Sequence, residues 1–293
     1  MSKQLRGSLL LLLATVIWGS AFIAQSVGME LIGPFTFQAV RCGLAVLFLF
    51  PLSFLMERGK GSMQKWKNPK LWKAGLICGC ALFVAASLQQ VGLVYTDAGK
   101  AGFITAMYIV LVPILGIFRK QKPSPAVILS VILAVIGLYL LSCLNAEGIN
   151  KGDLMVMGCA LAFAVQITCI DMLAGDLDGV RLNCVQALVV AVLSVPFMVF
   201  TETVVLSNLL ACWLPLGFAG ILSMGVAYTL QIQGQKSLEP ATASLIMSLE
   251  SVFAVLGGWL ILKESMTLTE ILGCCLVFAG VILSQLPSPK SKQ

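Results

Sequence analysis

Two oppositely charged residues, Arg41 and Glu250, interrupt stretches of sequence that are otherwise strongly apolar. Arg41 lies seven residues into the stretch that starts at Pro34, and Glu250 lies ten residues into the stretch that starts at Pro240. A charged side chain at the centre of a bilayer costs about 2.5–3.5 kcal/mol on insertion scales, so such residues face the protein interior or a water-filled pathway. A guanidinium there can bind a carboxylate, and a carboxylate can take up and release a proton. The sequence leaves three roles open: Arg41 as a carboxylate anchor with Glu250 as a proton-coupling candidate, a structural ion pair between two helices, or Arg41 reaching a lipid headgroup.

Neutral polar and aromatic residues occupy the same apolar stretches. Helical spacing places Trp18 and Gln25 on one face, and likewise Tyr228 and Gln231. Together they predict a cavity lined by amides and aromatic rings, suited to a polar molecule with an apolar part. The alternative is that the Gln and Thr side chains only hydrogen-bond neighbouring helices, at about 0.6 kcal/mol each. The predicted substrate-binding residues are Trp18, Gln25, Gln38, Arg41, Gln90, Thr105, Tyr108, Gln166, Tyr228 and Gln231.

Several other chemistries are excluded by composition. The chain has no histidine, which removes His-based acid–base catalysis and most transition-metal sites. Its ten cysteines nearly all fall in or beside apolar stretches and lack zinc-site spacing, so they are predicted to pack as small hydrophobic residues. The net charge of +6 comes from basic residues that cluster between apolar stretches, which indicates a membrane surface and not nucleic acid. We therefore expect no metal, no other cofactor and no nucleic-acid partner.

The elements that position these residues must be membrane helices. Hydrophobic residues make up 59% of the 293-residue chain and charged residues 11%, against about 45–50% and about 25% in soluble domains. A helix needs about 20 apolar residues to cross the hydrocarbon core, and only helices satisfy the backbone over such continuous apolar stretches. The fold class predicted is an all-α, multi-pass membrane protein with about ten transmembrane helices. The predicted spans are residues 7–27, 34–56, 71–94, 98–118, 124–142, 153–174, 181–200, 213–234, 240–262 and 268–286.

The distribution of basic residues predicts that both termini are cytoplasmic, because cytoplasmic loops carry the excess of Lys and Arg. With the N-terminus inside, 15 basic residues fall inside and 3 outside, and Arg41 lies within a span. Short loops and the absence of an Asn-x-Ser/Thr acceptor suit the bacterial cytoplasmic (inner) membrane. The inside set is Lys3, Arg6, Arg58, Lys60, Lys65, Lys67, Lys70, Lys73, Arg119, Lys120, Lys122, Arg181, Lys236, Lys290 and Lys292, and the outside set is Lys100, Lys151 and Lys263.

The two halves of the chain show weak internal similarity. A shift of 145 positions lays Trp18 over Phe163 and Arg41 over Gln186, which keeps two successive spans in one register. Because five is an odd number of helices, the second copy must cross the membrane in the opposite direction, and inverted repeats of this kind are typical of transporters. We predict repeats over residues 1–144 and 152–287, with a mid-membrane site between them, in a monomer or homodimer.

Three motifs resemble the EamA-like family of the drug/metabolite transporter superfamily. They are Ala-Thr-Val-Ile-Trp-Gly-Ser-Ala-Phe at 14–22, Tyr-Thr-Asp-Ala-Gly-Lys-Ala-Gly-Phe-Ile-Thr at 95–105 leading to Val112-Pro113, and Leu-Glu-Ser-Val-Phe at 249–253 with Gly257-Gly258-Trp259 and Lys263-Glu264. The resemblance implies ten helices in two inverted repeats, alternating access, and transport of small metabolites such as amino acids. The sequence departs from the family pattern at Ser251, where the ninth helix often reads Glu-Pro, and at Phe118-Arg119-Lys120, where Gly-Glu is common.

We therefore expect a secondary transporter, not an enzyme, whose partners are a small-molecule substrate and the lipid bilayer. The expected substrates are amino acids or related polar and amphipathic solutes, moved in the direction of export. The alternatives are a multidrug or cation efflux transporter of the same fold, and an integral membrane lipid-modifying enzyme. The enzyme would need catalytic polar residues clustered at one interface, whereas the acidic residues here are scattered along the chain.

Overall fold

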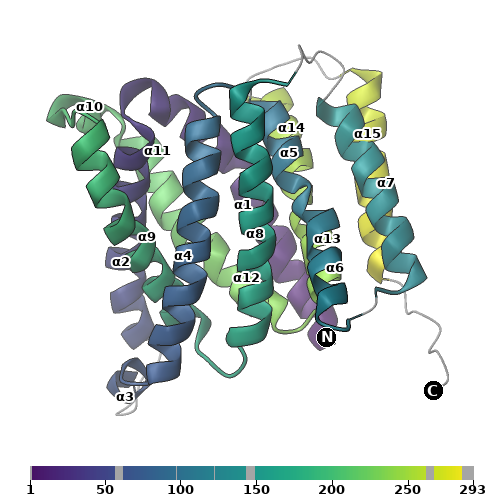
Figure 1. The fold of residues 1–293 in the computed structure, drawn as a ribbon, viewed down its shortest axis with the longest axis horizontal. Coiled ribbons are helices and arrows are strands. Elements are labelled where there is room, and N and C mark those ends of the chain that lie inside the picture. Colours follow the sequence, from purple (N-terminus) through teal and green to yellow (C-terminus); the bar gives the residue numbers. More distant parts are fainter. Residues whose placement is uncertain are drawn as a thin grey trace.

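The computed structural model describes residues 2–56, 62–96, 98–121, 123–142, 149–261 and 267–285, and every regular element within these ranges is helical. The long helices stand side by side in one bundle, with their axes roughly aligned (Figure 1). In chain order the helices are α1 Lys3–Leu31, α2 Pro34–Leu55, α3 Ser62–Trp66, α4 Pro69–Gly92, α5 Ala98–Ala106, α6 Tyr108–Phe118, α7 Pro125–Ser142, α8 Lys151–Leu173, α9 Gly179–Thr201, α10 Leu206–Ala211, α11 Trp213–Gly217, the π-helix η1 Phe218–Ala227, α12 Tyr228–Gln235, α13 Pro240–Met247, α14 Leu249–Ile261 and α15 Leu268–Gln285.

Within the described ranges, nine helical segments are long and apolar enough to cross a membrane, and Pro125–Leu141 is a shorter apolar helix. Together they correspond to the ten predicted spans, so the prediction of an all-α membrane protein is confirmed. Large apolar side chains such as Leu47 and Phe200 are 73% and 86% exposed, as a surface in contact with lipid requires. Several residues named in the sequence analysis lie outside the described ranges: Arg58, Lys60, Asp97, Lys122, Lys263, Glu264, Lys290 and Lys292, as does Cys143, one of the ten cysteines.

Helices from the two halves of the chain pack directly against each other. Helix α2 lies against α9, α4 against α8 and α9, α7 against α15, and α1 against α12 and α14. Two glycine pairs mark close approaches: a Cβ on Gly7 would lie 2.9 Å from the Gly234 carbonyl oxygen, and one on Gly152 would lie 2.6 Å from that of Gly92. The small residues let α1 meet α12, and α4 meet α8, backbone to backbone.

Side chains fix several helix ends at the edges of the bundle. The Asn150 side chain and Asp153 form a reciprocal capping box at the start of α8. At the start of α2, the Glu202 carboxylate accepts hydrogen bonds of 2.8 Å from the backbone N–H groups of Phe35 and Thr36. These contacts satisfy donors that have no partner within their own helix.

Three of the predicted spans are not continuous α-helices. The fourth span breaks at Met107, between α5 and α6, and the ninth breaks at Ser248, between α13 and α14. The eighth passes from α11 through the ten-residue π-helix η1 into α12. π-Helical turns are rare and often occur at functional sites. All three irregular segments border the same cavity, described next.

Candidate functional site

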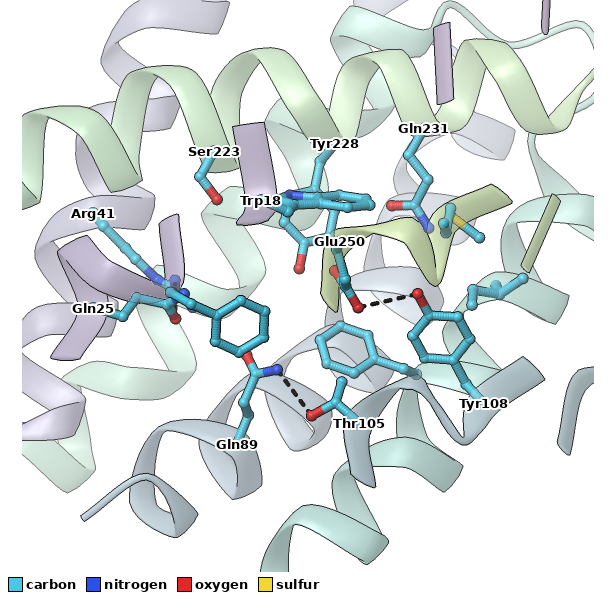
Figure 2. A pocket seen from close by; sticks show the side chains of 14 residues that line it. Trp18, Gln25, Arg41, Gln89, Thr105, Tyr108, Ser223, Tyr228, Gln231 and Glu250 are labelled. Carbon is cyan, nitrogen blue, oxygen red and sulfur yellow. Dashed lines mark hydrogen bonds between the residues drawn. The ribbon is translucent and has the colours of Figure 1, made fainter. Parts of the chain in front are cut away.

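A cavity lies at the centre of the bundle, enclosed by side chains from both halves of the chain; we call it the central cavity (Figure 2). Its volume is about 40 Å³, which holds a few water molecules and is far below the roughly 300–1,000 Å³ of small-molecule pockets. A substrate must therefore displace the walls in order to bind. The central cavity is lined by Trp18, Phe22, Gln25, Arg41, Gln89, Thr105, Tyr108, Phe163, Ile167, Ser223, Tyr228, Gln231, Met247 and Glu250.

Two charged side chains lie in this cavity without touching each other. The Arg41 guanidinium donates a 3.0 Å hydrogen bond to Gln25 Oε1, and the Glu250 carboxylate accepts a 3.0 Å hydrogen bond from the Tyr108 hydroxyl. Figure 2 shows these two pairs on opposite sides of the cavity. Arg41 is 6% exposed and Glu250 is 7% exposed, yet no ion pair joins them. The interhelical ion pair considered from the sequence is therefore not formed in this structure.

Aromatic rings form much of the wall between the two charges. Trp18 and Tyr228 meet edge to face with ring centroids 5.0 Å apart, and Tyr108 meets Phe163 in the same manner at 6.5 Å. These rings supply an apolar surface with polar atoms at its edge. The cavity can therefore contact an apolar group while its charged residues contact polar ones.

Polar atoms in the wall have hydrogen-bonding capacity that the protein does not use. Trp18 Nε1, Arg41 Nε and Gln231 Oε1 are buried and have no hydrogen-bond partner. A buried polar atom without a partner costs about 1–3 kcal/mol. A ligand or water that bonds to these three atoms would recover that free energy. Unpartnered polar atoms of this kind are more typical of binding sites than of packed cores.

Eight of the eleven residues predicted for the site line the central cavity, and three do not. Gln38 Nε2 donates to the hydroxyls of Ser87 and Ser194, at 3.0 and 3.1 Å, and so joins α2 to α4 and α9. Gln166 lies behind the wall, where its Oε1 accepts a 3.3 Å hydrogen bond from Gln231. Gln90 is 1% exposed, and its amide has no hydrogen-bond partner.

The sequence candidates omitted six lining residues: Phe22, Gln89, Phe163, Ile167, Ser223 and Met247. The repeat spacing could have found three of them, Gln89, Met247 and Phe163, from predicted residues, whereas Phe22 and Ile167 match only each other. Tyr108 and Glu250 are 142 positions apart, and the same spacing joins Gln89 to Gln231 and Thr105 to Met247. A spacing of 145 joins Trp18 to Phe163 and Phe22 to Ile167. Ser223 has no counterpart in the lining at either spacing.

Ion pairs hold α8 to the neighbouring broken helix at both of its ends. At one end Lys100 Nζ lies 2.6 Å from Asp153 Oδ2, and Thr96 donates a 2.7 Å hydrogen bond to the same carboxylate. At the other end Arg119 lies 2.9 Å from Asp171. Figure 1 places α5 toward the upper edge of the bundle and α6 toward the lower edge, where the N-terminus lies. The central cavity is thus flanked by one ion pair toward each membrane surface.

The described residues contain no group of three or more Cys, Asp or Glu side chains able to hold a metal ion. The nine cysteines within these ranges are free, and six of them are buried among other side chains, in keeping with their predicted packing role.

Comparisons with known proteins agree with this geometry. The chain is 33% identical to an uncharacterized transporter of Archaeoglobus fulgidus, over 97% of this chain and 87% of that one. It is 26% identical to the threonine/homoserine exporter RhtA of Salmonella typhimurium, over 97% and 92% of the two chains. A solved crystal structure that is 18% identical superposes with a TM-score of 0.79, covering 95% of this chain and 96% of the other, so the two share a fold. The profile of the EamA-like transporter family matches residues 5–143 and again residues 150–286. The chain therefore belongs to the EamA-like transporter family.

Proposed function

We propose that this protein exports amino acids across the bacterial cytoplasmic membrane by alternating access, in exchange for protons. The observation that carries the proposal is the separation of two opposite charges by aromatic rings in one buried cavity. A zwitterionic amino acid presents a carboxylate and an ammonium at one end and a side chain at the other. The guanidinium, the carboxylate and the rings of the central cavity match these three parts.

Arg41 is the proposed anchor for the substrate carboxylate. Its NH1 group is held by Gln25, while its Nε is buried without a partner and remains able to donate. A planar guanidinium binds a carboxylate through two parallel hydrogen bonds, which sets the orientation of the substrate as well as its affinity. The relative named threonine/homoserine exporter supports an amino-acid substrate.

Glu250 is the proposed proton-coupling residue. The chain has no histidine, and Glu250 is the one acidic side chain among the described residues that line the central cavity. A carboxylate that binds a proton becomes neutral and no longer attracts the ammonium of a substrate as an anion does. If the proton and the substrate ammonium compete for Glu250, a substrate molecule that enters the site from the cytoplasm displaces a proton that entered it from outside. That competition produces export driven by the proton gradient.

We propose that the broken helices move when access to the central cavity changes from one membrane face to the other. The breaks at Met107 and Ser248 flank Tyr108 and Glu250, so the halves of each span can tilt separately about the cavity. Matching residues at spacings of 142 and 145 on the two sides of the cavity support two inverted repeats, residues 1–144 and 152–287. The complete pathway then lies within one chain, whether the protein is a monomer or a homodimer, and both termini are cytoplasmic.

A multidrug or cation efflux transporter is the second candidate. The carboxylate of Glu250 lies near the rings of Trp18 and Tyr228, and a ring of this kind beside a carboxylate also suits an organic cation. An organic cation without a carboxylate has no group for Arg41 to bind. The two candidates therefore differ in whether transport needs a substrate carboxylate.

The test is uptake into sealed proteoliposomes of radiolabelled amino acids and small cationic drugs, with and without an imposed pH gradient. Wild-type protein is compared with Glu250→Gln, which keeps the shape of the side chain and removes its titration. Amino-acid flux that follows the pH gradient only in the wild type supports the proposal. Flux of cationic drugs alone supports the second candidate, and amino-acid flux that ignores both gradient and substitution makes the protein a facilitator.

A further inference from the structure

A second cavity of about 610 Å³ lies between α1, α2 and α12, and we call it the lateral cavity. Among the residues that the structure describes, none lines both this cavity and the central cavity. The two cavities lie on different faces of one helix, since Tyr228 and Gln231 line the central cavity whereas Thr229 and Leu230 line the lateral one. Unlike the central cavity, it has room for a large ligand without any movement of its walls.

The walls of the lateral cavity are mainly apolar. Leu10, Phe48, Leu52 and Leu230 contribute side chains that are only partly buried. Leu10 comes from α1, Phe48 and Leu52 from α2, and Leu230 from α12, so three helices form a groove for a hydrocarbon chain. In a membrane, the molecule available to fill such a groove is a lipid.

Basic residues gather at one end of the lateral cavity. Lys3 and Arg6 belong to the first turns of α1, at the edge of the bundle where the N-terminus lies (Figure 1). Both side chains are exposed, and neither forms an ion pair with any other residue that the structure describes. Two cations without acidic partners at the mouth of an apolar groove are complementary to a lipid that has an anionic headgroup.

The third basic residue of this cavity, Lys236, is already engaged. Its ammonium donates a hydrogen bond to the Leu177 carbonyl oxygen and is attracted by Asp176 and Asp178. Burial lowers the pKa of Lys236, which lies just beyond the end of α12. Because its charge is offset by these acids, Lys3 and Arg6 carry the positive charge that remains available at the mouth.

We propose that the lateral cavity binds an anionic phospholipid from the leaflet that faces the N-terminal edge of the bundle. The lipid phosphate lies against Lys3 and Arg6, and an acyl chain lies along Leu10, Phe48 and Leu52. Basic pockets between membrane helices bind anionic headgroups, and each Lys or Arg near the surface contributes to that affinity. The inference does not depend on the transported substrate, because no lining residue is shared with the central cavity.

The experiment is native mass spectrometry of the full chain, delipidated in detergent and titrated with phosphatidylglycerol or with phosphatidylcholine of identical acyl chains. The wild type is expected to retain one phosphatidylglycerol selectively. The double variant Lys3→Gln/Arg6→Gln is expected to lose roughly 30-fold in affinity for phosphatidylglycerol, from about fivefold for each cation. Its affinity for phosphatidylcholine is expected to stay unchanged.

The matched control is Lys70→Gln/Lys73→Gln, which removes two exposed cations from the start of α4, outside the lateral cavity. It should keep the wild-type preference for phosphatidylglycerol. The proposal is overturned if the wild type binds both lipids equally, or if both double variants lose the preference to the same degree. It is also overturned if a second copy of the chain occupies the lateral cavity, seen as a dimer that binds no phosphatidylglycerol. Circular dichroism of both variants checks that the exposed substitutions leave the fold intact.

Discussion

The Tyr108 hydroxyl donates a 3.0 Å hydrogen bond to the Glu250 carboxylate, and the two residues stand at matching breaks in two membrane helices. Tyr108 is the first residue of α6, directly after the break at Met107, and Glu250 is the second residue of α14, directly after the break at Ser248. The bond thus joins the two irregular helices at the depth of the central cavity. Any separation of these helices on that side must first break it.

Replacement of Tyr108 and of Glu250 should have different effects on transport. Tyr108→Phe removes one hydrogen bond to a charged group, worth about 1.5–3 kcal/mol, but leaves the titratable carboxylate in place. We expect slower or weaker transport that still follows the pH gradient. Glu250→Gln should instead abolish the dependence on the gradient. Measurement of initial flux against the imposed gradient in proteoliposomes separates them, and loss of gradient dependence in Tyr108→Phe would assign the coupling to the pair and not to Glu250 alone.

Substitution of Arg41 should weaken binding only for substrates that have a carboxylate. Removal of one partner from a buried charge pair costs about 2–3 kcal/mol at the lower end of the measured range, so Arg41→Gln should raise KM by roughly 30- to 150-fold. Arg41→Lys keeps the charge but loses the planar double donor, and its KM should be intermediate. The control is the decarboxylated amine of the same substrate. An equal rise in KM for the amine would show that Arg41 supports the cavity wall and does not bind the carboxylate.

The two ion pairs beside α8 should control access from opposite membrane faces. Lys100→Gln removes the pair with Asp153, and Arg119→Gln removes the pair with Asp171. Cys159 is a natural reporter, because its Sγ lies 4.0 Å from the Thr105 hydroxyl in the cavity wall. Each variant should increase alkylation of Cys159 by a membrane-impermeant maleimide from one side only, by up to about fivefold for the partly exposed Arg119–Asp171 pair and by more for the largely buried Lys100–Asp153 pair.

Alkylation is measured by peptide mapping in vesicles of both orientations. Lys100→Gln and Arg119→Gln should respond to reagent on opposite sides of the membrane. Increased labelling from the same side in both variants would contradict the prediction that the two ion pairs control access from opposite membrane faces.

Close packing of α7 against α15 should make Gly137 intolerant of a side chain. A Cβ at this position would lie 2.6 Å from the Gly273 carbonyl oxygen, a backbone atom that cannot move aside without shifting a helix. Overpacking of this kind typically costs about 1–3 kcal/mol, so Gly137→Ala should lower the melting temperature in detergent. Gly43→Ala is the matched control, because nothing lies within 4 Å of a Cβ there. Equal melting temperatures for the two variants would refute the packing argument.

The sequence predicts the helices well because length and hydropathy alone decide whether a segment can span a membrane. Apolar stretches such as residues 34–56 and 181–200 correspond closely to α2 and α9. The breaks at Met107 and Ser248 were not predicted, since both lie within stretches that are long and apolar enough to be read as continuous spanning helices. Breaks at such positions depend on packing between spans, which hydropathy does not describe.

The site was harder to predict than the fold because adjacent helical residues point in directions about 100° apart. Gln89 and Gln90 are the same type of residue at adjacent positions, yet only Gln89 lines the central cavity. Repeat spacing distinguishes them, since 142 positions after Gln89 lies the cavity residue Gln231, and the same distance after Gln90 lies Ile232. Ser223 could not be found this way, and its role in the wall follows only from the winding of η1.

Specific hydrogen bonds support that winding. The Tyr228 N–H donates to the Ser223 carbonyl, five residues back, and the Asn183 amide on α9 donates to the carbonyls of Met224 and Gly225 at 2.8 and 2.9 Å. Each residue added to or removed from a helical turn rotates everything beyond it by roughly 100°. If η1 rewound as an α-helix, Tyr228 and Gln231 would turn away from the central cavity, and the side chains that line the lateral cavity would turn toward it. The angular phase of α12, and with it the choice between two chemically different surfaces, therefore depends on a π-helical winding that Asn183 of a neighbouring helix supports.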